Sequence, residues 1–325
     1  MKYNVIDGHS HLAFETEEEI VGQNIIMPKI PDILDYKKLA LKNEISEVMF
    51  CPCTSPVIIN KKTNSAIAYC LWEYINGRFN YYSEIVKDGK IIKNDISYNP
   101  YKVINERLSN YINSINEDFK INFVPAINLY FDTKEYLEEL ISKKPKALKV
   151  HGISTGIYDL NKIDKELLEL ISSSGIPLVI HTDYIDNPKS PIEKLYYENN
   201  PINWINLLLR YDIKGYLAHG CRLSKESSDI LKNYKGQFLV GISPDILLNN
   251  ETERLMSSTD NYLEDLLKIF DEDLLSFDID YNWNYTDRIT NTFDDNQLNR
   301  INTYIKDEKV KKKILNNNSR KFFNL

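Results

Sequence analysis

The stretch VIDGHSHL, residues 5–12, ends a short apolar run with two of the chain's five histidines. Runs of Val and Ile of this kind are typical of buried strands. Along a strand, residues i and i+2 point to the same face, so His9 and His11 are expected on one face and Ser10 on the other. Two imidazoles on one face can reach a single metal ion at about 2.0–2.1 Å. We therefore interpret the stretch as the first strand of the fold, and its end as part of a metal site.

Seven further apolar runs follow along the chain, at 47–53, 121–129, 147–152, 177–181, 215–220, 237–243 and 274–280, and segments with helical spacing separate most of them. The runs are nearly continuous, as expected of parallel strands covered on both faces. Eight β/α units without a break in composition predict an α/β fold, a closed (β/α)8 TIM barrel. An open doubly wound sheet is the alternative. No G-x-G-x-x-G follows the first strand, so a dinucleotide site has no support.

The connection between the second and third strands, at about 55–118, is much longer than the others. It contains SAIAYCLWEYI and YKVINERLSNYINSI, and both segments have helical spacing. We predict a helical insertion that covers one mouth of the barrel. Residues 1–325 are therefore expected to form one barrel domain that carries this insertion.

Composition narrows the class of protein. The 325 residues are 42% hydrophobic and 27% charged, which is ordinary for a globular chain. A net charge of −7 and a pI near 5.4 favour neither nucleic acid nor a membrane surface as partner. The first residues do not have the pattern of a secretory signal, and no run of 18 apolar residues occurs. Four cysteines form no disulfide framework, so a cytoplasmic location is expected.

Every histidine follows the same positional rule. His9 and His11 end the first predicted strand, His151 the fourth, His181 the fifth and His219 the sixth. In a (β/α)8 barrel the carboxyl ends of the strands form one rim, and catalysis takes place there. Because imidazole is also the commonest metal ligand, we expect the five rings to meet around one site.

A carboxylate is expected to complete a site built from neutral histidines. The eighth strand, LLSFDID, carries Asp278 and Asp280 two residues apart, so both can face inward. Asp280 lies nearer the rim, and we predict that it binds the metal and accepts a proton from the attacking water. Asp278 is interpreted as a supporting or core polar residue.

Four other residues carry weaker signals. Cys51 and Cys53 lack the second pair that a structural zinc site needs, and buried, unreactive thiols are expected. Asp7 is either an acceptor that supports a ligand or a turn residue. Arg222 either holds an anionic group of a substrate or forms a loop salt bridge.

The motifs VIDGHSHL, ALKVHG, IPLVIHTD, GYLAHGC and LLSFDIDYNW occur in this order over nearly the whole chain. Together they resemble the successive strand-end motifs of the amidohydrolase superfamily, in particular the amidohydrolase-related metal-dependent hydrolases with a TIM-barrel fold. The C-terminal KILNNNSRKFF also resembles the closing helix of that family. A lone H-x-H would be a weak signal, whereas five ordered motifs are specific.

The resemblance implies a role for each matching position. His9 and His11 would bind the metal, and His181 would be a further ligand. His219 would bind a second metal or polarise the substrate. Asp280 would bind metal and carry the proton.

The fourth strand departs from the usual pattern in one respect. Lys149 stands where two-metal members have a carboxylated lysine or a glutamate that bridges the ions, so it is either that bridge or a contact for a substrate carboxylate. His151 follows on the same strand face and joins the candidate ligands, although many members do not need a ligand there. No glutamate occupies this strand, which argues against the nuclease-like branch.

The resemblance implies an enzyme, a metal-dependent hydrolase. One or two divalent ions, with Zn²⁺ expected, would activate water for attack on an amide, ester or lactone bond of a small-molecule substrate. A non-oxidative decarboxylase with the same site is the alternative, and a non-catalytic metal- or ligand-binding barrel is a third. The substrate and the oligomeric state, including a homo-oligomer, stay open.

Overall fold

The computed structural model of the chain describes residues 3–12, 18–21, 33–52, 57–60, 65–87, 90–182, 188–243, 259–280, 286–287, 292–293 and 297–325. Its centre is a three-stranded and a five-stranded sheet, and neighbouring strands run parallel throughout both. Their strands are β1 (Val5–Leu12), β3 (Ile45–Pro52), β8 (Lys120–Phe123), β9 (Leu148–Val150), β10 (Leu178–Ile180), β11 (Gly215–Leu217), β12 (Phe238–Gly241) and β13 (Leu275–Ser276).

Hydrogen bonds join the two sheets into one ring. On one side, a parallel bridge between Ala126 and Lys149 connects the chain after β8 to β9. On the other side, the Gly8 N–H on β1 donates to the Phe277 carbonyl just after β13 at 2.9 Å. The strands therefore follow one another around the ring in chain order. The predicted (β/α)8 barrel is confirmed, and each of the eight predicted strands has its counterpart.

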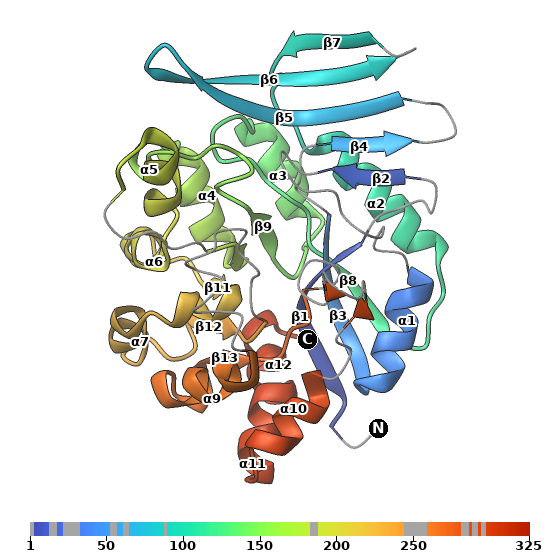
Figure 1. Cartoon of the computed structure of the whole chain (residues 1–325), viewed down its shortest axis with the longest axis vertical. Helices are drawn as coiled ribbons and strands as arrows, with labels where there is room; N and C mark the ends of the chain where they lie inside the picture. Colours follow the sequence, from blue (N-terminus) through green and yellow to red (C-terminus); the bar gives the residue numbers. More distant parts are fainter. Residues whose placement is uncertain are drawn as a thin grey trace.

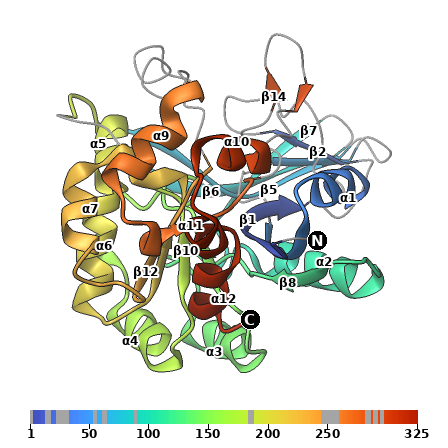
Figure 2. The same cartoon turned by 90° about the horizontal axis from the view of Figure 1, so that it is seen from below.

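Helices cover the outside of the ring (Figures 1 and 2). The segments predicted as helical between the third strand and the eighth form helices, and several begin at a capping side chain, such as Thr133 before α3 and Asp164 before α4. Gly175 ends α4 with a φ of 67°, as its position predicts. The helices between the strands are α1 (Ile33–Lys42), α2 (Lys102–Ser114), α3 (Lys134–Ser142), α4 (Lys165–Ser174), α5 (Pro191–Glu198), α6 (Pro201–Arg210), α7 (Lys225–Leu231) and α9 (Thr259–Ile269).

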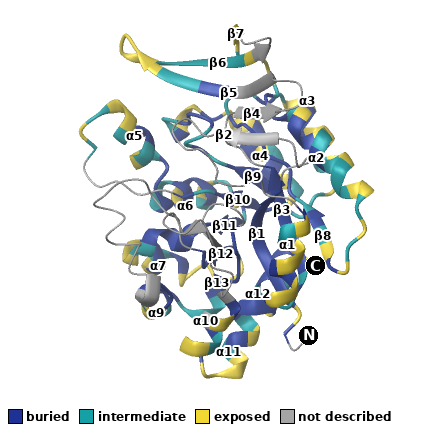
Figure 3. Cartoon of the chain, turned by 45° about the vertical axis from the view of Figure 1, so that its right-hand side comes forward, coloured by how far each residue is buried: buried dark blue, intermediate teal, exposed yellow. Residues whose placement is uncertain are grey.

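Alternation along the strands divides the core into two layers, and Figure 3 shows the central strands as buried. In β3, Val48 and Phe50 belong to the large apolar cluster that includes the helix residues, whereas Met49 and Cys51 belong to a smaller separate one. The smaller cluster draws side chains from several strands and fills the interior of the barrel. Its members are Met49, Cys51, Val124, Ala147, Val179, Tyr216, Leu239, Phe322 and Phe323.

The C-terminal segment closes one end of the barrel. It comprises α10 (Gln297–Tyr304), α11 (Glu308–Lys312), a π-helical segment (Lys313–Asn317) and α12 (Asn318–Phe323). Phe323 stacks on Tyr216 inside the ring, with 5.5 Å between ring centroids. The side chain of Asn316 donates to the carbonyl of Asn4, just before β1, so this end is the one where the strands begin.

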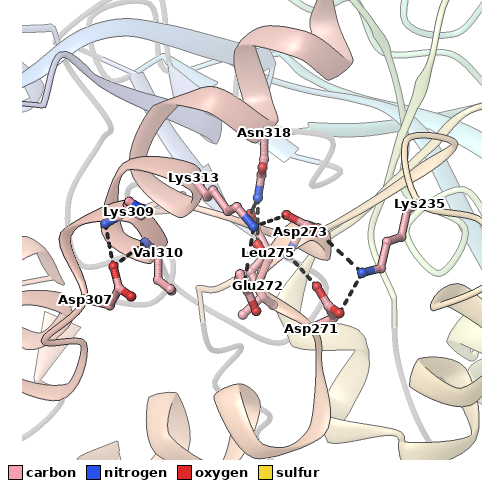
Figure 4. A network of polar contacts seen from close by, with 10 residues as sticks. All are labelled: Lys235, Asp271, Glu272, Asp273, Leu275, Asp307, Lys309, Val310, Lys313 and Asn318. Atoms are coloured by element: carbon pink, nitrogen blue, oxygen red, sulfur yellow. Dashed lines mark hydrogen bonds and ion pairs between the residues drawn. The ribbon is translucent and has the colours of Figure 1, made fainter.

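Polar contacts attach the C-terminal segment to the chain before β13 (Figure 4). Lys313 Nζ lies 2.6 Å from a carboxylate oxygen of Asp273, and the Asn318 amide donates to the Leu275 carbonyl at 2.8 Å. Lys235 pairs with Asp271 at 2.7 Å. The acidic group at 271–273 is therefore neutralised by lysines, which gives it a structural explanation.

The predicted helical insertion at 55–118 is wrong for most of its length. An antiparallel sheet in the order β2-β4-β5-β6-β7 takes its last four strands from this stretch and β2 from the chain after β1, and α2 is the one helix of the insertion within the described residues. Asn76 and Gly77 join β5 to β6 with φ values of 54° and 82°. Consecutive left-handed residues of this kind make the turn of a tight hairpin, which overrides the helical spacing of the preceding run. The strands are β2 (Glu18–Val21), β4 (Val57–Asn60), β5 (Ser65–Ile75), β6 (Arg78–Lys87) and β7 (Lys90–Asp95).

The sheet nevertheless lies where the insertion was expected, over one mouth of the barrel (Figure 1). Side chains of β5 and β6 reach the segment that follows the carboxyl end of β9, with Trp72 bonded to Ile153 and Tyr81 to Gly156. The sheet thus covers the mouth of the barrel opposite to the end that the C-terminal segment closes. Among the described helices, none combines the length and the apolar character needed to cross a bilayer.

Candidate functional site

An irregularity in the pairing of the first strand precedes its two histidines. The pairing of β1 with β3 shifts register between Asp7 and Ser10. Gly8 lies inside this irregularity, and a Cβ there would lie 2.7 Å from the hydroxyl of Tyr216. Glycine is therefore needed where the strand bends against the filled interior, directly before His9.

Asp7 ties the end of β1 to the segment after β13. Its carboxylate accepts hydrogen bonds from the hydroxyls of Ser10 and Tyr36, both at 2.6 Å, and from the backbone N–H of Ile279 at 3.1 Å. Burial raises the pKa of Asp7 to about 6. The side chain supports the site by holding two strand ends together, and its partners are hydroxyls and backbone groups.

Three ring nitrogens surround the carboxylate of Asp280. His11 Nε2 lies 3.3 Å and His9 Nδ1 lies 3.6 Å from Oδ1, and His219 Nδ1 lies 3.8 Å from Oδ2. The backbone N–H of Asp280 donates to the carbonyl of His9 at 2.9 Å, so ring closure itself brings these residues together. Ligand atoms of His9, His11 and Asp280 lie within 4.8 Å of one another, and all three residues are buried.

This arrangement fits a divalent metal. Among the described residues, His9 Nδ1 and His219 Nδ1 are buried without a hydrogen-bond partner. His11 Nδ1 lies 3.1 Å from the Pro52 carbonyl, which requires a proton on Nδ1 and leaves the lone pair of Nε2 facing Asp280. Burial lowers the pKa of His9 and His219 well below the ordinary value, so both rings are neutral. Neutral imidazoles beside one carboxylate are the donor set that such an ion requires.

Lys149 lies next to this group, inside the barrel. Its side chain is fully buried on β9, and Nζ lies 2.7 Å from Nε2 of His9. After burial, the charge of Lys149 is the next largest cause of the lowered His9 pKa. The residue therefore lies directly beside the group formed by His9, His11 and Asp280.

The two remaining histidines extend the site toward the mouth. His181 Nδ1 lies 2.9 Å from His219 Nε2, and the His151 ring stacks on His181 with centroids 3.8 Å apart. The five rings thus form one row, in the order His11, His9, His219, His181 and His151. His151 and His181 are half-buried and lie outside the compact ligand group, and burial lowers the pKa of both.

A left-handed turn follows β11 and places His219. All five residues of His219–Leu223 have φ between 46° and 62°, and only Gly220 is a glycine. Such a conformation costs roughly 1–2 kcal/mol for each non-glycine residue. Thr182 holds the turn at both ends, since its carbonyl accepts from Arg222 Nε at 2.8 Å and its hydroxyl donates to the Ala218 carbonyl at 2.7 Å. Nothing in the sequence predicted this turn.

The other polar residues singled out from the sequence have separate positions. Asp278 is buried beside the site and accepts from the Ser243 N–H at 2.6 Å, but it does not belong to the ligand group. Cys51 lies in the barrel interior, and burial raises the pKa of its thiol to about 12. Cys53 lies outside the described residues.

Comparison with known proteins finds similarity in structure alone. No family model matches the chain. No curated protein matches it either.

Solved structures with a similar fold cover nearly the whole chain. A candidate 2-pyrone-4,6-dicarboxylic acid hydrolase from Pseudomonas putida superposes with a TM-score of 0.57 at 12% identity, over 99% of this chain and 98% of its own. A 5-carboxyvanillate decarboxylase from Sphingomonas paucimobilis gives 0.56 at 10% identity, over 99% of each chain. A dihydroorotase from Campylobacter jejuni gives 0.54 at 13% identity, over 99% and 83%. Similarity at this level of identity supports the α/β barrel fold.

Proposed function

We propose that this chain is a metal-dependent hydrolase that activates water for attack on an amide, ester or lactone bond of a small molecule. The observation that carries the proposal is the buried group formed by His9, His11 and Asp280 at the carboxyl ends of the first and last barrel strands. The barrel fold, in which this rim is the usual place of catalysis, supports it. One structural neighbour is itself named as a candidate hydrolase.

His9, His11 and Asp280 would hold the ion, and His219 and His181 would complete its surroundings. We propose Zn²⁺, because imidazole nitrogen and carboxylate oxygen are its usual ligands together with thiolate. When bound, such an ion lowers the pKa of water toward neutrality and polarises a carbonyl group. We propose that one or two ions bind. Lys149 would be either a carboxylated bridge between two ions or a contact for a substrate carboxylate.

The chain's own groups would move the proton and steady the charge. Asp280, at 3.3 to 3.8 Å from three ring nitrogens, would accept a proton from the attacking water and later donate it to the leaving group. Lys149 or His219 would help to stabilise the oxygen on which negative charge develops, since both lie against the same group of ligands. Burial of these side chains would strengthen each of these interactions.

A non-oxidative decarboxylase is a second candidate that keeps the same site. The observation in its favour is the superposition on a 5-carboxyvanillate decarboxylase, which covers as much of this chain as the candidate hydrolase does. Release of CO₂ from a panel of aromatic and enoic acids would distinguish it from the hydrolase. A non-catalytic binding barrel would hold metal and turn over neither a carboxylic acid nor an amide, ester or lactone.

The domain organisation and the cellular compartment of the enzyme are also part of the proposal. We propose that residues 1–325 act as one unit, with the insertion at 55–118 as its cover. Cys51, Cys70 and Cys221 are free and buried in the described part of the chain, which supports a reducing compartment such as the cytoplasm.

Metal analysis of the purified protein tests the proposal. Wild-type protein is expected to carry stoichiometric divalent metal and to hydrolyse members of a panel of lactones, esters and amides. The His9→Ala/His11→Ala variant is expected to lose both metal and activity. Retention of stoichiometric metal in a folded double variant would contradict the ligand assignment.

A further inference from the structure

The hairpin of β5 and β6 has two different faces. Trp72 pairs with Tyr81 across the strands, and Tyr74 pairs with Phe79. Because alternate residues share a face, these four aromatic side chains lie on one side of the hairpin. Phe79 contacts both Trp72 and Tyr74, with centroid distances of 5.6 and 5.1 Å. One face of the hairpin is thus an aromatic surface.

The opposite face carries an ion pair. Lys93 on β7 lies 2.9 Å from the Glu73 carboxylate, and its Nζ lies 3.6 Å from the ring centroid of Tyr82. Tyr82 directly follows Tyr81, so the two tyrosines of one strand point to different faces. The chain therefore offers two neighbouring tyrosines, of which one belongs to the aromatic surface.

The aromatic surface binds the β9–α4 loop, residues 151–164. Trp72 Nε1 donates to the Ile153 carbonyl at 2.8 Å, and the Tyr81 hydroxyl donates to the Gly156 carbonyl at 2.6 Å. Both donors are side chains of the hairpin, and both acceptors are backbone carbonyls of the loop. These contacts fix the main chain of the loop rather than any one of its side chains.

The fit between hairpin and loop is close. Phe79 stacks on Tyr158 with a centroid distance of 4.7 Å and an interplanar angle of 14°. Gly156 has a φ of 68°, and a Cβ there would lie 2.7 Å from Tyr81 and 2.9 Å from Trp72. The loop thus uses its glycine both for the turn and for the approach of the two aromatic rings.

The same loop holds the ring and backbone of His151, its first residue. The His151 carbonyl accepts from both the N–H and the hydroxyl of Thr155, each at 3.0 Å. The Ser154 N–H donates to His151 Nδ1 at 3.3 Å. Since Nδ1 accepts this bond, the proton of the neutral ring lies on Nε2. His151 therefore presents a hydrogen-bond donor and has no free lone pair for a metal ion.

We propose that the β5–β6 hairpin is a positioning element of the active site, which fixes the β9–α4 loop so that His151 presents its Nε2–H to an oxygen of the substrate. His151 is half-buried and stacks on His181 at the opposite end of the histidine row from His11. Its partner on the substrate would be a carbonyl or carboxylate oxygen. The substrate contact rests on the proposed function, whereas the link from hairpin to loop to His151 does not.

Selective labelling of histidine tests the link directly, because the chain has only five histidines. The Tyr81→Phe and Trp72→Phe variants each remove one hydrogen bond to the loop and keep an aromatic ring. In both, the ¹⁵N ring signals of His151 and of the stacked His181 are expected to shift, while those of His11 stay in place. Tyr82→Phe, the matched control on the other face, is expected to leave all five ring signals unchanged.

Kinetics and metal content complete the test. Each of the two variants is expected to lower kcat/KM roughly ten-fold, the effect of about one hydrogen bond, with full metal content. His151→Ala is expected to lower kcat/KM further and also to keep its metal. If Trp72→Phe reduces stability, Tyr81→Phe, which removes a single oxygen atom, decides the question.

The outcomes separate this inference from the proposed function. Unmoved His151 signals in Tyr81→Phe, equal shifts in all five histidines, or loss of metal in His151→Ala would each overturn the inference. Shifted His151 signals in a protein that hydrolyses nothing would support the positioning link and overturn the proposed function.

Discussion

At the scale of single residues, Asp280 is the one carboxylate among the three clustered ligand side chains, and it lies near ring nitrogens of three histidines. Asp280→Asn keeps the shape of the side chain and removes its charge and its ability to accept a proton. We expect hydrolysis to fall by about 10²–10⁴-fold, together with weaker metal binding, measured by steady-state kinetics and metal analysis.

Asp278→Asn is the matched control for this variant. The asparagine keeps an oxygen for the Ser243 N–H, and the residue lies outside the ligand group. Asp278→Asn is therefore expected to keep its metal. Equal activity of Asp280→Asn and wild type would rule out the role in proton transfer.

Asp132 makes stability depend on pH. Burial raises its pKa to about 7, although one oxygen accepts the Asn128 N–H at 2.8 Å. Between the ordinary carboxyl pKa near 4 and about 7, the folded state binds more protons at this site than the unfolded state, so stability falls as the pH rises through this window. Asp132→Asn keeps the hydrogen bond and removes the titration. We expect the variant to be more stable than wild type at pH 8, by a few kcal/mol at most, and similar to it at pH 4.

Urea unfolding of both proteins at the two pH values measures this difference. The comparison cancels the titration of all other groups that the two proteins share. A variant with the same pH dependence as wild type would show that Asp132 ionises at its ordinary pKa in the folded protein.

At the scale of elements, the turn His219–Leu223 makes an unusual demand on its residues. Cys221 has a φ of 46° and is fully buried. Glycine normally costs about 0.5–1 kcal/mol relative to alanine within regular structure, but a left-handed residue reverses the preference. We expect Cys221→Gly to be more stable than Cys221→Ala, by about 1 kcal/mol in the free energy of unfolding.

The same pair of substitutions at Cys70 is the control. Cys70 is also a buried free cysteine, but it lies within β5. There alanine is expected to be more stable than glycine. The same order at both positions, measured by thermal unfolding, would mean that the turn does not store strain.

Strands and helices could be predicted correctly where the sequence carries one clear pattern of hydrophobic spacing. The eight barrel strands are continuous apolar runs, and both faces of each are covered by protein, so pattern and structure agree. The apolar residues of SAIAYCLWEYI satisfy both the helical and the strand period, whereas the Asn76–Gly77 pair that follows this segment favours a hairpin. Side chains of β5 and β6 contact the loop after β9, which local spacing does not reveal. The left-handed turn depends on Thr182, a residue from the preceding strand end, so no local signal exists for it.

At the scale of the whole molecule, the C-terminus is part of the barrel core. Phe323 is 1% exposed and stacks on Tyr216 inside the ring. Phe323→Ala is expected to cost about 3–5 kcal/mol in the free energy of unfolding, because it opens a cavity that neighbouring strands cannot fill. Denaturant titration measures the loss. Lys321→Ala, on the exposed side of the same helix, is expected to change stability by less than about 0.5 kcal/mol.

The positions of the histidines could be predicted from the whole molecule better than from any single motif. Strand order predicts that five rings at four strand ends share one rim, and the structure brings them into one row. The sequence could not tell which histidines bind the metal and which do not, because this depends on the direction of each side chain. His11 uses Nδ1 for a carbonyl and keeps Nε2 for the site, whereas His151 uses Nδ1 as an acceptor. Which nitrogen remains available is decided by the loops around each ring.

The joint between the first and last strands has a consequence for synthesis of the protein. The bond from the Ile279 N–H to the Asp7 carboxylate spans 272 positions of the chain. His9 emerges early from the ribosome, but Asp280 is added only when most of the polypeptide has been made. Until then His9 and His11 lack the carboxylate of Asp280 and the last strand that closes the barrel around them. Capture of the proposed ion would therefore be a late event, and a fragment that stops short of the last strand is expected to bind it poorly.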